Sequence, residues 1–202
     1  MGRLVVDQIE GRSGNANTIT IPTGHTLLSP GGIVQVVHNT VTSTAAYATG
    51  SGADNVSTTG LTCTITPKSS ASIIIVQFNC TLGTTVYQAK LLLGRTINGG
   101  GNIWIGRGDA EGGRPQATSV ANFYDNVTTT QQYKYMPVSN TIKDAPSTTG
   151  EIVYTLYMGA YNGQTVYLNR SHLWQNNNAG GYDAVPSSNM IVWEVTQWAY
   201  LK

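Results

Sequence analysis

The sequence is short of charge. Charged residues make up 10% of its 202 residues, and the formal net charge is +1, whereas an average globular protein is about 25% charged. A chain with so little positive charge has no basic field to attract nucleic acid or anionic lipid, so we expect neither as a partner. Thr, Ser, Asn and Gly take the place of charge, a composition that is common in proteins outside cells and on virus particles.

Long hydrophobic runs are also missing. No stretch approaches the ~20 apolar residues of a membrane span, and residues 1–12 contain no apolar run long enough for a signal peptide. We therefore expect a chain that folds in a reducing cytoplasm and does not insert into a membrane. Hydrophobic residues still make up 40% of the sequence, which is enough for the core of one domain of this length.

Cysteine is scarce, with Cys63 and Cys80 as the only two. If 61–66 and 73–80 form a hairpin, Cys63 lies opposite a residue near Ile75. Cys80 is then about 15 Å away at ~3.3 Å per residue, which is beyond the reach of a disulfide. We expect two buried free thiols that pack as small hydrophobic side chains, with a disulfide as the alternative.

The usual signatures of catalysis are absent. None of the three histidines has a second ligand at metal-binding spacing, no G-x-S-x-G motif is present, and the Gly-rich segment 96–101 lacks the ending of a phosphate loop. Asp109 and Glu111 lie in a loop and are weak evidence for acid–base chemistry, while calcium at either of them or at Asp183 is an alternative. We predict no enzyme, no cofactor and no metal.

Residues 58–94 contain the clearest pattern, three successive segments with apolar residues at every second position. This period predicts strands with one buried face, and we interpret them as a three-strand meander packed against a second sheet. The predicted inward rows are Leu61, Cys63 and Ile65; Ile74, Val76, Phe78, Cys80 and Leu82; and Tyr87, Ala89, Leu91 and Leu93.

Short strands with frequent turn signals are predicted along the rest of the chain, and no window of ten residues has helical spacing. This pattern indicates an all-β antiparallel sandwich or jelly roll. The other expected strands are 33–38, 102–106, 118–124, 131–136, 151–158, 165–170 and 189–197, with Ile103, Ile105, Ile152, Tyr154, Leu156 and Met158 among the inward residues.

The first 32 residues differ from the rest of the chain, because a turn-rich segment at 29–32 separates them from the first strand of the body. So short a segment cannot hold a core of its own. We predict an extended attachment arm over 1–32 and a β-sandwich body over 33–202; a plain first strand of the main sheet is the alternative. The apolar residues assigned to the arm are Leu4, Val5, Val6, Ile9, Ile19 and Ile21.

Two strands carry apolar residues on both faces, which a two-layer sandwich cannot bury. Ile73 and Ile75 are expected on the opposite face of their strand from Ile74 and Val76, and Trp193 on the opposite face from Met190 and Val192. Trp104 is likewise expected on the opposite face from Ile103 and Ile105. Aromatic residues concentrate at interfaces. We predict that Ile73, Ile75, Trp104 and Trp193 form a subunit interface; for Trp104 and Trp193 the alternative is a sugar-binding role.

Ligand contact is predicted for two polar loops, 107–116 and 173–186. Rigidly held loops often carry function, and the candidate contact residues are Arg114, Trp174, Tyr182 and Asp183. An exposed aromatic ring beside amide and carboxylate side chains suits a sugar, because the ring stacks on the apolar face of a pyranose. For Trp174 a sugar site and a subunit interface stay equally open.

Four segments together resemble small structural proteins of tailed bacteriophages, especially those of marine and cyanobacterial phages. These segments are LVVDQI (4–9), ITIPTGHTLLSPGGIVQVV (19–37), TTGLTCTITPKSSASIIIV (58–76) and SNMIVWEVTQ (188–197). The resemblance implies a trimeric jelly-roll body of the C1q/tumour-necrosis-factor kind behind an attachment arm. Unlike long fibres, this chain has no repetitive shaft or coiled coil.

The resemblance implies a non-enzymatic virion protein, made in the host cytoplasm, which docks on other capsid or tail proteins. The expected role is a short trimeric tail or head fibre, whose partner outside the particle is a glycan of the host surface. A capsid decoration or cement protein without a ligand is the first alternative, and a carbohydrate-binding module is the second.

Overall fold

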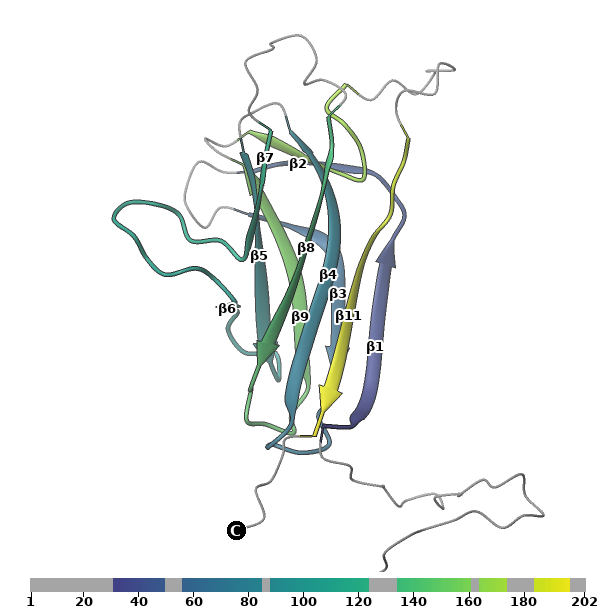
Figure 1. Cartoon of the computed structure of the whole chain (residues 1–202), viewed down its shortest axis with the longest axis vertical. Coiled ribbons are helices and arrows are strands. Elements are labelled where there is room, and N and C mark those ends of the chain that lie inside the picture. The colour runs from purple at the N-terminus through teal and green to yellow at the C-terminus, as the bar shows by residue number, and fades with distance from the viewer. Residues whose placement is uncertain are drawn as a thin grey trace, which may run out of the picture.

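The computed structural model describes residues 31–49, 56–84, 88–123, 134–160, 164–173 and 184–196. In these residues the protein is all β, with antiparallel strands in two facing sheets (Figure 1). The prediction of an antiparallel sandwich of the jelly-roll kind is therefore confirmed. The predicted arm, apart from its last two residues, lies outside the described residues.

Six strands form sheet A, in the order β1-β11-β4-β10-β2 with β8 on the other side of β4. Five strands form sheet B, in the order β3-β9-β5-β6 with β7 also paired to β5. Sheet A contains β1 (Ile33–Val41), β2 (Ala45–Ala48), β4 (Ile73–Thr84), β8 (Met136–Asp144), β10 (Thr165–Leu168) and β11 (Ser188–Val195). Sheet B contains β3 (Ser57–Ile65), β5 (Gln88–Ile97), β6 (Ile103–Ile105), β7 (Ser119–Asn122) and β9 (Ile152–Ala160).

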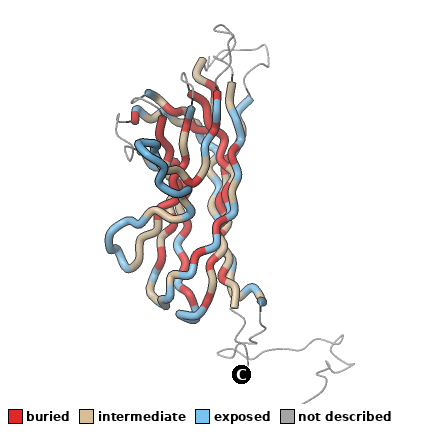
Figure 2. Tube along the Cα trace, turned by 60° about the vertical axis from the view of Figure 1, so that its left-hand side comes forward, coloured by how far each residue is buried: buried red, intermediate tan, exposed pale blue. Residues whose placement is uncertain are grey.

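The core lies between the sheets and consists of the alternate residues of both (Figure 2). Every described residue of the three predicted inward rows is buried, from Leu61 in β3 to Leu93 in β5. The inward residues predicted for β9 are buried as well, whereas Ile103 in β6 is 53% exposed and that prediction is wrong.

The predicted meander is wrong, because β3, β4 and β5 alternate between the two sheets. β3 pairs with β9, β4 pairs with β11 and β8, and β5 pairs with β9. The segment 66–72 is long enough to carry the chain across the ~10 Å between packed sheets. Alternation identifies a strand's buried face, but both sheets bury their faces in the same core, so it does not assign a strand to a sheet.

The predicted strand 131–136 is misplaced: β8 begins at Met136 and runs to Asp144, residues 134 and 135 are not in a strand, and residues 131–133 are outside the described part. Pro137 and a run of polar residues hide this strand from a search for alternating apolar positions. β8 pairs with β4, and no further strand pairs with its other edge in the described residues. An edge strand tolerates proline because the missing N–H is not needed by a neighbour.

Asparagine side chains bridge the two open seams between the sheets. At one seam, Asn39 Nδ2 of β1 donates to the carbonyl oxygens of Gly60 (3.2 Å) and Thr62 (3.1 Å) in β3. At the other seam, Asn140 Nδ2 of β8 donates to the carbonyl oxygen of Thr118 at 2.9 Å. Edge carbonyls that would otherwise be open to a foreign strand are thus occupied.

Both cysteines are buried and free, as expected. They lie in opposite sheets, and the Cys63 thiol donates to the carbonyl oxygen of Met190 at 3.7 Å. Burial raises the pKa of Cys63 to about 11 and, despite a hydrogen bond with Ser188, that of Cys80 to about 12.

These two thiols predict a loss of stability in alkali. A pKa raised by folding contributes stability that is complete below the unfolded pKa, near 8.5, and is lost as the pH rises through the folded pKa. Between about pH 9 and 11 each thiol should lower the free energy of unfolding by up to about 1.4 kcal/mol per pH unit. Urea unfolding under reducing conditions measures this slope. The Cys63→Ala, Cys80→Ala double variant should have a shallower slope; an unchanged slope would contradict the prediction.

Candidate subunit interface

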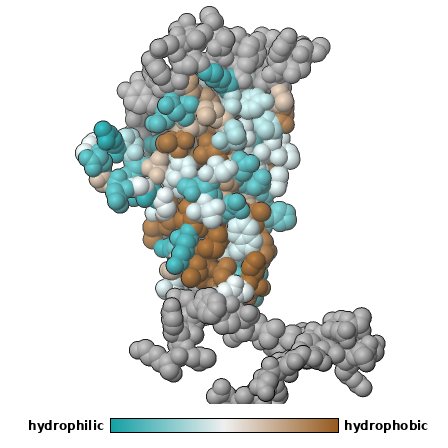
Figure 3. Space-filling model, viewed as in Figure 1, coloured by the Kyte–Doolittle hydropathy of each residue, from teal (hydrophilic) through white to brown (hydrophobic). Residues whose placement is uncertain are grey.

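The outer face of sheet A is apolar at one end. Register places Val36, Trp193 and Ile75 side by side across β1, β11 and β4. The adjoining row contains Ile33, Val195 and Ile73. We call seven outward residues the apolar end: Ile33, Val36, Ile73, Ile75, Ile191, Trp193 and Val195. Figure 3 shows hydrophobic side chains gathered on the lower half of this face.

The other half of the same face is polar. The next row combines His38, Gln77 and Thr141 with Ile191, and the row beyond it contains Thr40, Asn189, Asn79 and Ser139. Neither polar row contains an acidic or basic residue other than His38, whereas Lys143 lies beside Ile75 in the apolar row of Val36 and Trp193. The face thus changes from polar to apolar along its length, and its apolar area, with one lysine beside it, lies at the end where β4 begins and β11 ends.

Exposure differs across the apolar end. Ile33 and Val36 are 61% and 50% exposed, and the other five residues are partly buried. Moving a fully exposed Ile or Val out of water contributes roughly 1.5–3 kcal/mol, and contiguous apolar surface on a soluble protein marks an interaction site. Such a surface is suited to association with an apolar surface of another subunit.

A buried carboxylate holds the strands that carry the apolar end. Glu194 lies between Trp193 and Val195 but points inward and is 0% exposed. Its Oε1 accepts hydrogen bonds from the Lys68 backbone N–H and the Ser72 hydroxyl, both at 2.7 Å, and its Oε2 accepts one from Gln35 Nε2 at 2.6 Å. β1, β11 and the connection between β3 and β4 are thereby joined at one point, and buried polar groups need such partners.

Three of the four predicted interface residues lie together. Ile73, Ile75 and Trp193 belong to the apolar end, but Trp104 lies opposite Gly94 on the outer face of sheet B. The alternation of the sequence indicates that Trp104 points away from the core, but it does not indicate which of the two sheets contains this residue. The interface itself stays a prediction, and the structure does not bring Trp104 to the face occupied by the other three.

Ile33 and Val36 were missed because β1 contains an irregularity. The register shifts between Ile33 and Gln35, so that Val34 lies between two paired residues and the alternation changes phase. A β-bulge of this kind places an odd and an even residue on the same face. The sequence IVQVVH contains no turn residue that would reveal it.

Of the predicted ligand contacts, only Arg114 is in the described part of the chain. It is exposed on the excursion between β6 and β7, which projects from the side of the sandwich (Figure 2). The base of this excursion is held by Gln116 Nε2, which donates to the Gly108 carbonyl oxygen at 2.6 Å. Trp174, Tyr182 and Asp183 lie outside the described residues, as do the arm residues Leu4, Val5, Val6, Ile9, Ile19 and Ile21, so no ligand site is assembled from them.

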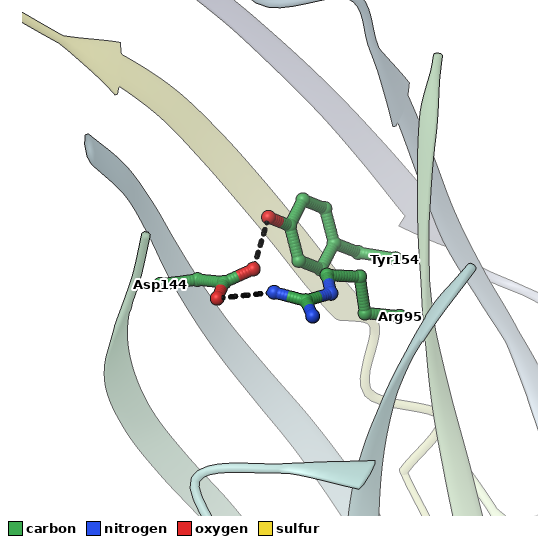
Figure 4. A network of polar contacts seen from close by, with 3 residues as sticks. All are labelled: Arg95, Asp144 and Tyr154. Carbon is green, nitrogen blue, oxygen red and sulfur yellow. Dashed lines mark hydrogen bonds and ion pairs between the residues drawn. The ribbon is translucent and has the colours of Figure 1, made fainter. Parts of the chain in front are cut away.

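One ionic cluster lies inside the sandwich (Figure 4). Arg95 Nη1 donates to Asp144 Oδ1, and the Tyr154 hydroxyl donates to Asp144 Oδ2, both at 2.7 Å. Burial, together with the hydrogen bond to Asp144 and its charge, raises the pKa of Tyr154 above its usual range. Its enclosed position, with Asp144 only 8% exposed, indicates a structural role.

His172 lies beside an aromatic ring and a cation near the end of β10. Its Nδ1 lies 3.0 Å from the Tyr167 hydroxyl, and the Arg170 guanidinium lies 4.5 Å from the centre of the Tyr167 ring. Partial burial and then the charge of Arg170 lower the pKa of His172. Within the described residues, no three His, Cys, Asp or Glu side chains come close enough to hold a metal ion, and no helix is long and apolar enough to span a membrane.

In comparisons with known proteins, no family model matches the chain, and no curated protein matches it significantly.

Proposed function

We propose that this chain is a non-enzymatic structural subunit of a tailed-bacteriophage particle. In this proposal it is a short tail or head fibre, in which three copies associate through the apolar end of sheet A. The arm at 1–32 docks the trimer on another virion protein, and the body contacts a glycan on the host surface. The first alternative is a capsid decoration protein that associates in the same way but binds no ligand.

The apolar end is the observation that carries the proposal. Seven outward apolar residues, with a single lysine beside them, are costly to expose to water. Closed cyclic association covers such a surface in every copy without leaving a free end. The number three comes from the sequence resemblance alone, and the charge-poor composition further supports a role in a particle.

The proposed arm predicts the effect of a truncation. Removing residues 1–28 should leave the strands of the body intact, because β1 begins at Ile33 and pairs with β11 over its length, up to Val41 opposite Ser188. The truncated protein should remain folded and soluble but should fail to join particles in a phage that carries the deletion. Mass spectrometry of purified particles measures its incorporation; incorporation at the level of the full-length chain would contradict the proposed arm.

A further inference from the structure

The outer face of sheet B carries uncharged side chains around a pair of aromatic residues, with Lys90 one row beyond Leu92. Register places Thr62, Thr155, Gly94 and Trp104 in one row across β3, β9, β5 and β6. The neighbouring row on one side contains Thr64, Val153 and Thr96, and on the other Tyr157 lies opposite Leu92. None of these side chains is charged. We call the set Thr62, Thr64, Thr96, Trp104, Thr155 and Tyr157 the threonine–aromatic face.

Trp104 and Tyr157 meet edge to face. Their ring centres are 5.1 Å apart and their planes are at 89°, which is a favoured arrangement for aromatic rings. The absence of a side chain at Gly94 makes room for this pair, since a Cβ there would lie 2.8 Å from Tyr157 Cε2. Leu92 on the same face is completely buried, while Trp104 and Tyr157 remain partly exposed.

Hydroxyl and amide groups surround the pair. The Thr62 and Thr155 hydroxyl oxygens lie 3.2 Å apart, and each hydroxyl can both donate and accept hydrogen bonds. The exposed Asn102 side chain lies over Gly94, close to Tyr157. Threonine is common in strands because its branched side chain fits them, so the threonines alone do not indicate a binding site. Rigid aromatic rings next to a small number of uncharged hydrogen-bonding groups are, however, the combination found in ligand-binding surfaces.

We infer that the threonine–aromatic face binds an uncharged saccharide. An aromatic ring stacks on the apolar C–H face of a pyranose, while hydroxyl and amide side chains exchange hydrogen bonds with its hydroxyl groups. A charged sugar finds no counter-ion among these side chains. The inference rests on the host-contact part of the proposed function and moves it from the loops to sheet B, which stays open when sheet A is covered.

The test is a titration of the full chain with soluble neutral oligosaccharides of glucose, galactose, mannose and rhamnose, followed by calorimetry. Sulfated and phosphorylated oligosaccharides form the charged set. Binding to at least one neutral member is expected, with an affinity about tenfold lower in Trp104→Ala, consistent with the loss of a stacking ring. Binding to no neutral sugar, or to charged sugars only, overturns the inference.

A second variant, Thr155→Val, keeps the test valid if Trp104→Ala fails to fold. It preserves the shape of the side chain and removes only its hydroxyl. It should weaken binding severalfold, whereas the matched change Thr141→Val on the outer face of sheet A should not. Equal affinities in Thr155→Val, Trp104→Ala and the wild type overturn the inference. The mass of the same samples in solution separates the two proposals: a trimer that binds no neutral sugar contradicts only the saccharide site, and a monomer that binds one contradicts only the assembly.

Discussion

Replacing Asp144 with alanine should destabilise the fold by about 3–5 kcal/mol, the expected cost of leaving one partner of a buried ion pair alone. Arg95 would keep its charge inside the sandwich with no carboxylate beside it, and the Tyr154 hydroxyl would lose its acceptor. The side chains of Arg95 and Asp144 are 15% and 8% exposed, so water can restore little of what is lost. Arg95 Nε already lacks a hydrogen-bond partner.

Two control variants separate the ion pair from its surroundings. Tyr154→Phe removes one hydrogen bond to a charged group and should cost about 1.5–3 kcal/mol, less than the loss of Asp144. Replacing Arg95 and Asp144 together with Met and Leu removes both charges, and should cost less than Asp144→Ala alone because no buried charge is left. Urea unfolding at one fixed protein concentration measures all three. A cost below about 1 kcal/mol for Asp144→Ala would show that the cluster contributes little.

Placing charge in the apolar end should abolish assembly while the body stays folded. In the variant Ile73→Asp, Ile75→Asp two carboxylates replace apolar side chains on the outer face of β4, in rows with Val195 and Trp193. The carboxylate at position 75 lies beside Lys143, but the one at position 73 has no cation opposite it in the described pairing, and burial of an unpaired carboxylate between subunits is too costly to be offset by the remaining contacts. The oligomer should therefore dissociate completely at micromolar concentration, as seen by light scattering behind a sizing column.

The matched control is a change on the polar half of the same strand. Asn79 lies on the outer face of β4 in a row with Thr40, Asn189 and Ser139, and Asn79→Asp adds a carboxylate there, two rows away from Ile75 and outside the apolar end. This variant should keep the mass of the wild type and the same β-sheet circular dichroism. If both variants keep the wild-type mass, the apolar end is not the interface; if the Ile73, Ile75 variant loses its β-sheet signal, single substitutions at Ile75 replace it.

Local features of this fold could be predicted from sequence. The inward rows of β3, β4, β5 and β9 follow from a period of two, and the buried thiols follow from their place in those rows. Sheet membership could not be predicted, because it depends on pairing partners far apart in the chain: β3 with β9, and β1 with β11. Two departures from a regular pattern hid features of the fold: Pro137 hid the edge strand β8, and the bulge in β1 hid one residue in each of the two apolar rows, Ile33 and Val36.

The two candidate surfaces also differ in how far the sequence could predict them. Outward apolar residues on β4 and β11 were visible because each strand is apolar on both faces, and the structure places these strands side by side. Trp104 looked equivalent to Trp193 from its phase alone, yet the two residues lie on opposite sheets. Its neighbours Gly94 and Tyr157 come from other strands, so no local pattern in the sequence could reveal the aromatic pair.

The mass of the unmodified chain in solution tests the central claim most directly. Light scattering behind a sizing column, or sedimentation equilibrium, at micromolar concentration should give three times the mass of one chain. This mass should be stable on dilution through the micromolar range, since the apolar end is expected to be covered in each copy. A single-chain mass at micromolar concentration would contradict the account of sheet A as a subunit interface.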